Sequence, residues 1–181
     1  MKLTGVDMNR RSKIDVCLIA MIITIIMAIG CGKADNTLTD NILSEGYSFE
    51  ADGVSMMVDG PSDEIIKSLG EPLSYYEVAS CAFEGLDKMY SYGSFELVTY
   101  TDEEVDYISE ISLKDDSVTT VEGIYIGSDR ASVIEAYGED YTLDADSYIY
   151  VKGNSKLTFV ITDDEVKAIR YNTMIFDDNK Q

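Results

Sequence analysis

Two stretches of the chain repeat one pattern of apolar residues that ends in glycine. "SDEIIKSLGEP" (62–72) and "DRASVIEAYGED" (129–140) coincide when Gly70 is placed on Gly138. The apolar residues then match in pairs: Ile65 with Val133, Ile66 with Ile134, and Leu69 with Tyr137. Apolar residues at this spacing before a glycine are typical of a short amphipathic helix. We therefore expect one helix in each half of the chain, with Ser62 as the N-cap of the first.

Predicted strands follow both helices, with glycines and turn sequences at matching positions. In the segments 89–113 and 149–171, Gly93 aligns with Gly153, and the turn sequences "TDEEV" and "TDDEV" follow at nearly the same distance. Alternating apolar and polar residues between such turns indicate antiparallel strands. We predict an α+β fold of two tandem repeats, each a short helix followed by an antiparallel meander of three to four strands.

The same patterns divide the chain into regions. "SFEADGVSMMVDG" predicts a strand pair around the Asp52-Gly53 turn, whereas the sequence just before it is polar and without periodicity. The predicted regions are a signal peptide at 1–30, a flexible tether at 31–45, the first repeat at 46–120, the second repeat at 121–175 and a disordered tail at 176–181.

The first thirty residues have the three parts of an export signal. Residues 1–15 carry four basic and two acidic side chains, and the apolar run "VCLIAMIITIIMAIG" fills residues 16–30. A membrane-spanning helix needs about 20 apolar residues. This run is shorter, and it ends in small residues, as a secretory signal peptide does.

Cys31 follows this run directly, in the sequence "AIGC", which resembles a bacterial lipobox. In that motif the signal is cut before the cysteine, whose sulfur receives a diacylglycerol, and two acyl chains such as palmitate hold a protein firmly on a membrane. Leucine is usual three residues before the cysteine, and Ala28 stands there instead. The alternative is an uncleaved anchor with an unmodified Cys31. Both interpretations place the rest of the chain outside the cytoplasm, and the first predicts a lipid-anchored protein of the cell envelope.

The helix motif also supports a family resemblance. "GSDRASVIEAYG", from Gly127 to Gly138, has a looser copy from Gly60 to Gly70. A short helix followed by a meander, repeated once on an exported chain, resembles the β-lactamase inhibitory protein family and the BamE-like (SmpA/OmlA) lipoproteins, over roughly residues 55 to 172. The resemblance implies a protein-binding module without catalysis, whose sheet forms a concave contact surface. The chain departs from the inhibitor because it lacks tryptophan and paired cysteines.

The chain is strongly acidic, with 34 acidic and 14 basic residues and a net charge of −20 at pH 7. Nucleic-acid binding depends on Lys and Arg that neutralise phosphates. We therefore expect no nucleic-acid partner, and anionic lipid surfaces are disfavoured for the same reason. The charge suits a solvated extracellular surface or a basic partner.

Few residues in the predicted mature chain could act as nucleophiles or bases. Cys17 leaves with the signal and Cys31 would carry lipid, so Cys81 remains alone among apolar neighbours, where we expect an inert, buried thiol. The chain has no histidine, which excludes Cys–His and Ser–His–Asp catalysis and histidine-ligated zinc. No P-loop, Rossmann or nucleophile-elbow motif occurs. We expect no enzyme activity, no cofactor and no metal.

Tyrosines are predicted to line one face of the strands. Leu157, Phe159 and Ile161 should face the helix, and Ile149 and Val151 should point inward on the preceding strand. The tyrosines then expected on the outer face are Tyr90, Tyr92, Tyr100, Tyr148 and Tyr150. Because tyrosine is prominent in protein interfaces, these five form a candidate partner-binding surface. The alternative is that they pack against their cross-strand neighbours.

The acidic clusters at 102–104, 144–147, 163–165 and 177–178 lack the alternating carboxylates and central glycine of an EF-hand. We predict that they form solvated hairpin loops. The chain as a whole is predicted to be a non-catalytic protein-binding or assembly module, with another extracytoplasmic protein as its partner. The alternative is a small-solute-binding protein, or a hydrolase that uses paired carboxylates, with a site between the repeats.

Overall fold

A computed structural model describes residues 46–80 and 85–177 of the chain. The predicted signal peptide and tether, Cys31 and Cys81 lie outside the described residues. Within those two ranges, no helix has the length and apolar character needed to cross a membrane.

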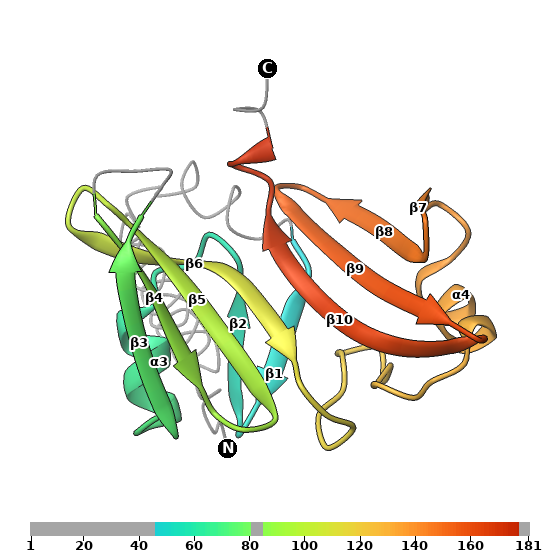
Figure 1. The fold of residues 1–181 in the computed structure, drawn as a ribbon, viewed down its shortest axis with the longest axis horizontal. Helices are drawn as coiled ribbons and strands as arrows, with labels where there is room; N and C mark the ends of the chain where they lie inside the picture. The colour runs from blue at the N-terminus through green and yellow to red at the C-terminus, as the bar shows by residue number, and fades with distance from the viewer. Residues whose placement is uncertain (1–45, 81–84, 178–181) are drawn as a thin grey trace, which may run out of the picture. The chain divides into compact units, whose positions relative to one another are not determined.

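The described elements form a hairpin, a large sheet and two short helices (Figure 1). Their bounds in chain order are β1 Ser48–Ala51, β2 Val54–Met57, α3 Asp63–Leu69, β3 Ser74–Ala79, β4 Leu86–Ser91, β5 Phe95–Asp102, β6 Val105–Leu113, α4 Arg130–Tyr137, β7 Thr142–Asp144, β8 Ser147–Lys152, β9 Ser155–Thr162 and β10 Glu165–Thr173. The large sheet is antiparallel, with strand order β3-β4-β5-β6-β10-β9-β8-β7. We call α3 with β3–β6 the first half and α4 with β7–β10 the second half.

The predicted fold class was wrong. Instead of an α+β chain of two separate helix-and-meander repeats, the described chain is mostly β, with one eight-stranded sheet and only two short helices. The helices have seven and eight residues, about two turns each. The two sets of strands join because β6 pairs with β10, with Ile111 opposite Tyr171. That pairing makes one continuous sheet, so neither meander is a unit with two edges of its own.

The β1–β2 hairpin covers the middle of the sheet. Its turn is the predicted one: Asp52 and Gly53 both have positive φ, at 52° and 77°, as a tight two-residue hairpin loop requires. Phe49 is fully buried, and its ring lies 5.3 Å from that of Phe95 on β5 and 6.0 Å from that of Tyr171 on β10. The hairpin therefore packs on the core where the two halves meet.

Each helix is preceded by a segment that pairs with the last strand of its own half. Before α3, the N–H of Asp59 donates to the carbonyl of Ile108 on β6, at 2.8 Å. Before α4, the N–H of Gly127 donates to the carbonyl of Val166 on β10, also at 2.8 Å. Because the backbone just before each helix is attached to the sheet in this way, the start of each helix is held in place.

The acidic sequences "TDEEV" and "TDDEV" form tight hairpin turns, as predicted. Glu103 and Glu104 connect β5 to β6, and Asp163 and Asp164 connect β9 to β10; all four have positive φ and are exposed. Two consecutive residues of positive φ match the right-handed twist of the strands. Among the described residues, no cluster of Cys, Asp or Glu has a geometry that could hold a metal ion.

Candidate functional site

The predicted orientation of the second-half tyrosines was wrong. Tyr148 and Tyr150 are 8% and 2% exposed, whereas Val151, predicted to point inward, is 53% exposed. The register explains the inversion, because Tyr148 lies opposite Phe159 and Tyr150 lies opposite Leu157. Residues directly opposite each other in an antiparallel pair share a face. Both tyrosines therefore point into the core on the same face as Leu157 and Phe159, although they were predicted to lie on the other face of the sheet.

The first-half tyrosines are also more buried than residues of an exposed contact surface would be. Tyr100 is 5% exposed, its ring lies 5.3 Å from that of Phe176, and burial raises the pKa of its hydroxyl to about 12. It is therefore not an exposed contact residue. Tyr90 and Tyr92 are half-buried and pack against the core. Tyr90 borders a cavity open to solvent.

In the second half, tyrosines fill the space between the helix and the sheet. Tyr137 of α4 has its ring 5.4 Å from that of Tyr150 and 5.1 Å from that of Phe159. Tyr141, just past the helix, lies 4.7 Å from Tyr148 and 5.7 Å from Tyr150. The hydroxyl of Tyr150 donates to the carbonyl of Gly138 at 2.9 Å. Aromatic packing thus closes this side of the second half.

In the first half, the corresponding space is an open groove. Helix α3 has no buried residue, although Ile65 and Leu69 touch the core. A groove of about 520 Å³ lies between α3 and the β3–β4 strands. Its lining residues are Ile66, Lys67, Gly70, Glu71, Pro72, Tyr75 and Tyr90. We call this cavity the α3 groove.

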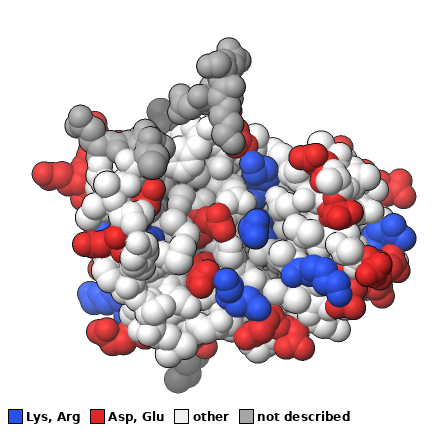
Figure 2. Space-filling model, in the orientation of Figure 1, with Lys and Arg blue, Asp and Glu red and all other residues white. Residues whose placement is uncertain are grey.

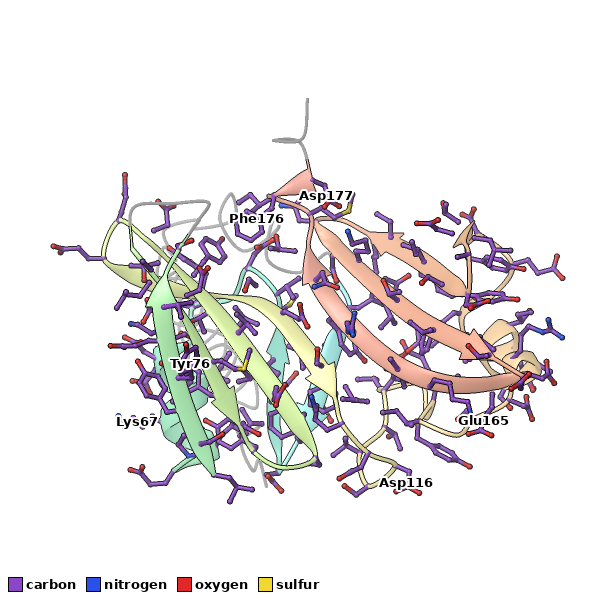
Figure 3. The ribbon with its side chains drawn as sticks, in the orientation of Figure 1. Lys67, Tyr76, Asp116, Glu165, Phe176 and Asp177 are labelled. Carbon is purple, nitrogen blue, oxygen red and sulfur yellow. The ribbon has the colours of Figure 1, made fainter. Side chains whose placement is uncertain are left out.

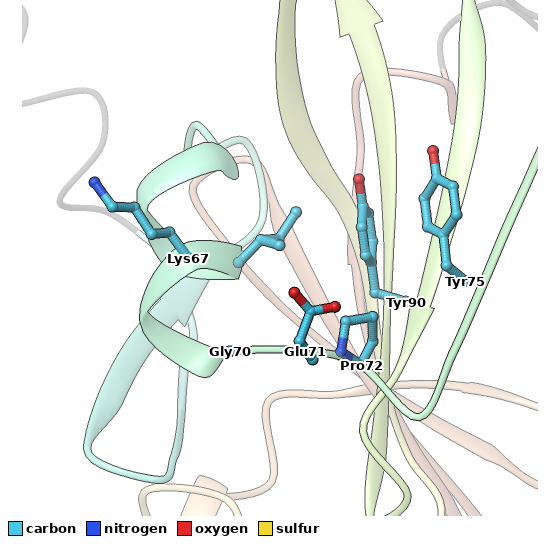
Figure 4. A pocket seen from close by; sticks show the side chains of 7 residues that line it. Lys67, Gly70, Glu71, Pro72, Tyr75 and Tyr90 are labelled. Atoms are coloured by element: carbon cyan, nitrogen blue, oxygen red, sulfur yellow. The ribbon is translucent and has the colours of Figure 1, made fainter.

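Figure 4 shows how the α3 groove is built. Tyr75 and Tyr90 stand side by side on one wall, and Glu71 and Pro72 form the floor between helix and strands. The two rings are 5.0 Å apart, which follows from the direct pairing of their residues across β3 and β4. Lys67 points away from the cavity. Gly70 turns the chain into the floor with a φ of 79°, which side chains rarely adopt.

The groove is polar at one side and negatively charged. The hydroxyl of Tyr75 donates to Glu77, and this hydrogen bond raises the pKa of Tyr75. Burial raises the pKa of Tyr90. The Tyr75 hydroxyl thus already donates its only proton to Glu77, whereas the Tyr90 hydroxyl stays protonated at neutral pH and can donate a hydrogen bond. Glu71 forms no ion pair among the described residues, because Lys67 pairs with Glu64 on its own helix.

The outer border of the groove is an exposed apolar strand pair. All six residues of β3 are exposed, and large apolar side chains gather on β3, β4 and the residue before β3. These are Leu73, Tyr75, Tyr76, Val78, Leu86 and Met89, which are 37% to 79% exposed. We call them the β3–β4 patch. Figure 3 shows Tyr76 on β3, the strand at the edge of the sheet.

The β3–β4 patch also stands out on the charge map. In Figure 2 the side of the face that carries β3–β5 is largely uncharged, with acidic and a few basic side chains along its margin, and most of the basic side chains lie over the rest of the face. An exposed apolar area that is rimmed by polar residues is typical of a protein interaction site.

This site was not predicted from the sequence. No strand was predicted between the first helix and residue 89, so Tyr75 and Tyr76 in "SYYEVA" were not considered. The signal was available, because the six residues Ser74–Ala79, which begin two positions after Pro72, include two tyrosines and a valine, and such residue types are typical of a strand. The groove lies within the first half and not between the two halves, where the alternative site was predicted.

No family model matches this chain, and no curated protein matches it. It is similar to the crystal structure of a DUF4309 family protein (YjgB) from Bacillus subtilis subsp. subtilis strain 168, with 19% identity over 68% of this chain and 84% of that chain and a TM-score of 0.39. A likeness at this level carries no argument about function. The resemblance to the β-lactamase inhibitory protein and BamE-like families stays a prediction.

Proposed function

We propose that this chain is a non-catalytic protein-binding module of the bacterial cell envelope, held at the membrane by lipid on Cys31, and that it contacts its partner through the β3–β4 patch and the α3 groove. The observation that carries the proposal is the concentration of exposed apolar side chains on one edge of the sheet. Burying such a patch removes apolar area from water, which favours association by about 25 cal/mol per Å² before the costs of binding are subtracted.

The chemistry of the groove supports binding rather than catalysis. Its lining holds two tyrosines, apolar side chains and a single carboxylate, Glu71. Hydrolysis by paired carboxylates needs two such groups on either side of the reacting bond. Tyrosine, in contrast, contributes a large apolar surface and a hydroxyl donor at little entropic cost, which suits recognition of a polypeptide.

The contact surface is tested with two variants of the full chain in its native envelope. Replacing Leu73, Tyr76 and Met89 together by serine removes three exposed side chains of the β3–β4 patch. Replacing Leu143 and Val151 by serine removes comparably exposed side chains from the other edge of the sheet. With the patch variant, we expect the amount of partner recovered by chemical crosslinking to fall at least about tenfold. This corresponds to a loss of about 1.4 kcal/mol or more in binding free energy.

The control variant should retain the partner at the level of the unmodified chain. Equal recovery with both variants, at equal thermal stability, would show that the partner binds elsewhere. The tether is tested separately by mass spectrometry of the protein extracted from membranes. An amino terminus at a diacylated Cys31 supports the tether, and an intact, unmodified amino terminus contradicts it.

A further inference from the structure

We propose that the free edge of β3 binds an extended segment of another protein as an added strand, and that this segment carries a basic residue close to a large apolar residue that enters the α3 groove. The inference rests on the proposed function and adds to it the mode of binding and the chemistry of the partner.

The hydrogen-bond pattern shows which backbone groups of β3 are available. The N–H of Ser80 donates to the carbonyl of Gly85 at 3.0 Å, in register with the β3–β4 pairing. Hydrogen-bonded pairs alternate along an antiparallel ladder. The even-numbered residues of β3 therefore bond to β4, and Tyr75, Glu77 and Ala79 direct their N–H and C=O groups toward the other edge of β3. No strand of the described part of the chain pairs with that edge, which we call the free edge.

An independent bond on the next strand pair gives the same result. Tyr92 donates its N–H to the carbonyl of Phe95 at 2.9 Å, so the even-numbered residues of β4 bond to β5. The odd-numbered residues of β4 are then left for β3, which agrees with the bond between Gly85 and Ser80. The free edge thus offers three residues at a spacing of two, as strand addition requires.

The two edges of the sheet differ in a way that points to β3. The opposite edge strand, β7, has only three residues, and short edge strands are a common protection against unwanted pairing. β3 has six residues, all exposed, and of these only Glu77 is charged. A long, exposed and apolar edge is an aggregation hazard unless a partner covers it. We infer that β3 is covered in its functional state.

The side chains of β3 would meet an added strand on both of its faces. Tyr75 lies on the groove side, opposite Tyr90. Tyr76 and Val78 lie on the other face and are 64% and 42% exposed. An added strand would extend the same alternation, so every second side chain of the partner would lie next to Tyr75 and the open α3 groove.

The charges decide what kind of segment fits. Glu71 on the groove floor and Glu77 on β3 form no ion pair among the described residues, and the basic neighbours are already paired: Lys67 with Glu64, and Lys88 with Asp106. A basic side chain of the partner would complement both carboxylates. A second copy of this chain fits poorly, because it has a net charge of −20 and would bring a further Glu77 to the same edge.

The probe is a displayed library of random ten-residue peptides, selected on the full chain in detergent micelles. We expect the enriched peptides to carry Lys or Arg within two positions of Phe, Tyr, Leu or Met, and to lack proline in the bound stretch. Enrichment of acidic or proline-rich peptides, or no enrichment at all, would overturn the inference. Concentration-dependent dimerisation of the chain through β3 would overturn it in favour of a second copy.

Two substitutions at one position separate the backbone contribution from the charge. Glu77→Pro removes an N–H that faces the free edge, where proline is tolerated, and should weaken binding of a selected peptide at least tenfold. Glu77→Gln keeps the N–H and should weaken binding less, with a reduced dependence on salt. Equal affinity of Glu77→Pro and the unmodified chain, when both are folded, would exclude strand addition.

Hydrogen exchange gives a readout within the strand itself. On binding the selected peptide, the amides of Tyr75, Glu77 and Ala79 should exchange at least tenfold more slowly, and the even-numbered amides of β3, already bonded to β4, should change less. If the triple serine variant loses its partner while these amides are unaffected, the proposed function stands and strand addition fails. If the partner is retained by that variant, the proposed surface itself fails.

Discussion

The two halves of the sheet have the same order of elements, but their helices pack differently. In the second half, Val133 of α4 is fully buried and Tyr137 joins an aromatic cluster with Tyr150 and Phe159. In the first half, α3 buries no side chain completely and stands beside an open groove. One half thus uses its tyrosines for stability, and the other leaves a comparable space open to solvent.

The residue three positions after each helix-ending glycine shows how the difference arises. In the second half this residue is Tyr141, whose ring packs between Tyr148 and Tyr150. In the first half it is Leu73, which is 79% exposed. The glycines themselves are alike, since Gly70 and Gly138 have φ values of 79° and 81°. The backbone is therefore turned in the same way, and the side chain that follows decides whether the space is filled.

The largest expected effect comes from the matched tyrosines of β4 and β8. Tyr150→Ala removes a ring that is 2% exposed and a hydrogen bond to Gly138, so we expect the free energy of unfolding to fall by about 3–5 kcal/mol. Tyr90→Ala removes a half-buried ring beside the groove and should cost roughly 1 kcal/mol.

Both values are measured by urea unfolding followed by far-ultraviolet circular dichroism. Tyr150→Phe serves as the control, because it keeps the ring and loses only the hydroxyl, at about 1 kcal/mol. Similar losses for Tyr150→Ala and Tyr90→Ala would break the comparison between a filled and an open half.

A smaller effect is expected from the matched apolar residues of the two helices. Val133→Ala creates a cavity under α4, where Val133 is fully buried, and should lower the free energy of unfolding by about 2 kcal/mol. Ile65→Ala on α3 should lower it by roughly 1 kcal/mol although it removes more atoms, because Ile65 is only half-buried. An equal or larger loss for Ile65→Ala would show that α3 is as firmly packed as α4.

The smallest effect concerns the two N-caps and depends on pH. Asp129 accepts a hydrogen bond from the N–H of Ser132 at 2.7 Å, and this bond lowers the pKa of Asp129 below its usual 3.8. Its contribution to stability is therefore complete above pH 3.8 and is lost as the pH falls through the lowered pKa. Asp129→Ala should lower the melting temperature at pH 7 and have less effect at pH 2.5.

Ser62, at the start of α3, provides the matched control. Ser62 is the N-cap residue of α3, as predicted, but its side chain makes no capping hydrogen bond, and its buried hydroxyl has no partner among the described residues. Ser62→Ala should leave the melting temperature unchanged or raise it slightly, at both pH values, because it removes an unsatisfied buried group. A loss equal to that of Asp129→Ala would mean that both helices depend on their caps.

Local features of the fold could be predicted from the sequence. The two short helices, the glycines that end them, the Asp52-Gly53 hairpin and the turns at 103–104 and 163–164 were all expected from neighbouring residues. Each of these depends on interactions between residues only a few positions apart, so local pattern carries enough information.

The candidate site could not be predicted in the same way. Tyr148 and Tyr150 alternate with Ile149 and Val151, and either pair could face the core, because both are apolar enough to be buried. The pairing of Tyr148 with Phe159 decided the matter. The α3 groove depends in addition on where α3 sits over β3 and β4, which no single segment encodes.

The sequence by itself determined the short elements and the acidic charge of this protein, because these follow from composition and from contacts close in the chain. Only the tertiary structure decided that the strands form one sheet, through β6 and β10, where Glu110 and Asn172 are hydrogen-bonded although 62 positions apart. It also decided which side of the sheet is buried and that β3 is an edge strand in the described part of the chain. Such features depend on packing between distant segments, for which many pairings are locally equivalent.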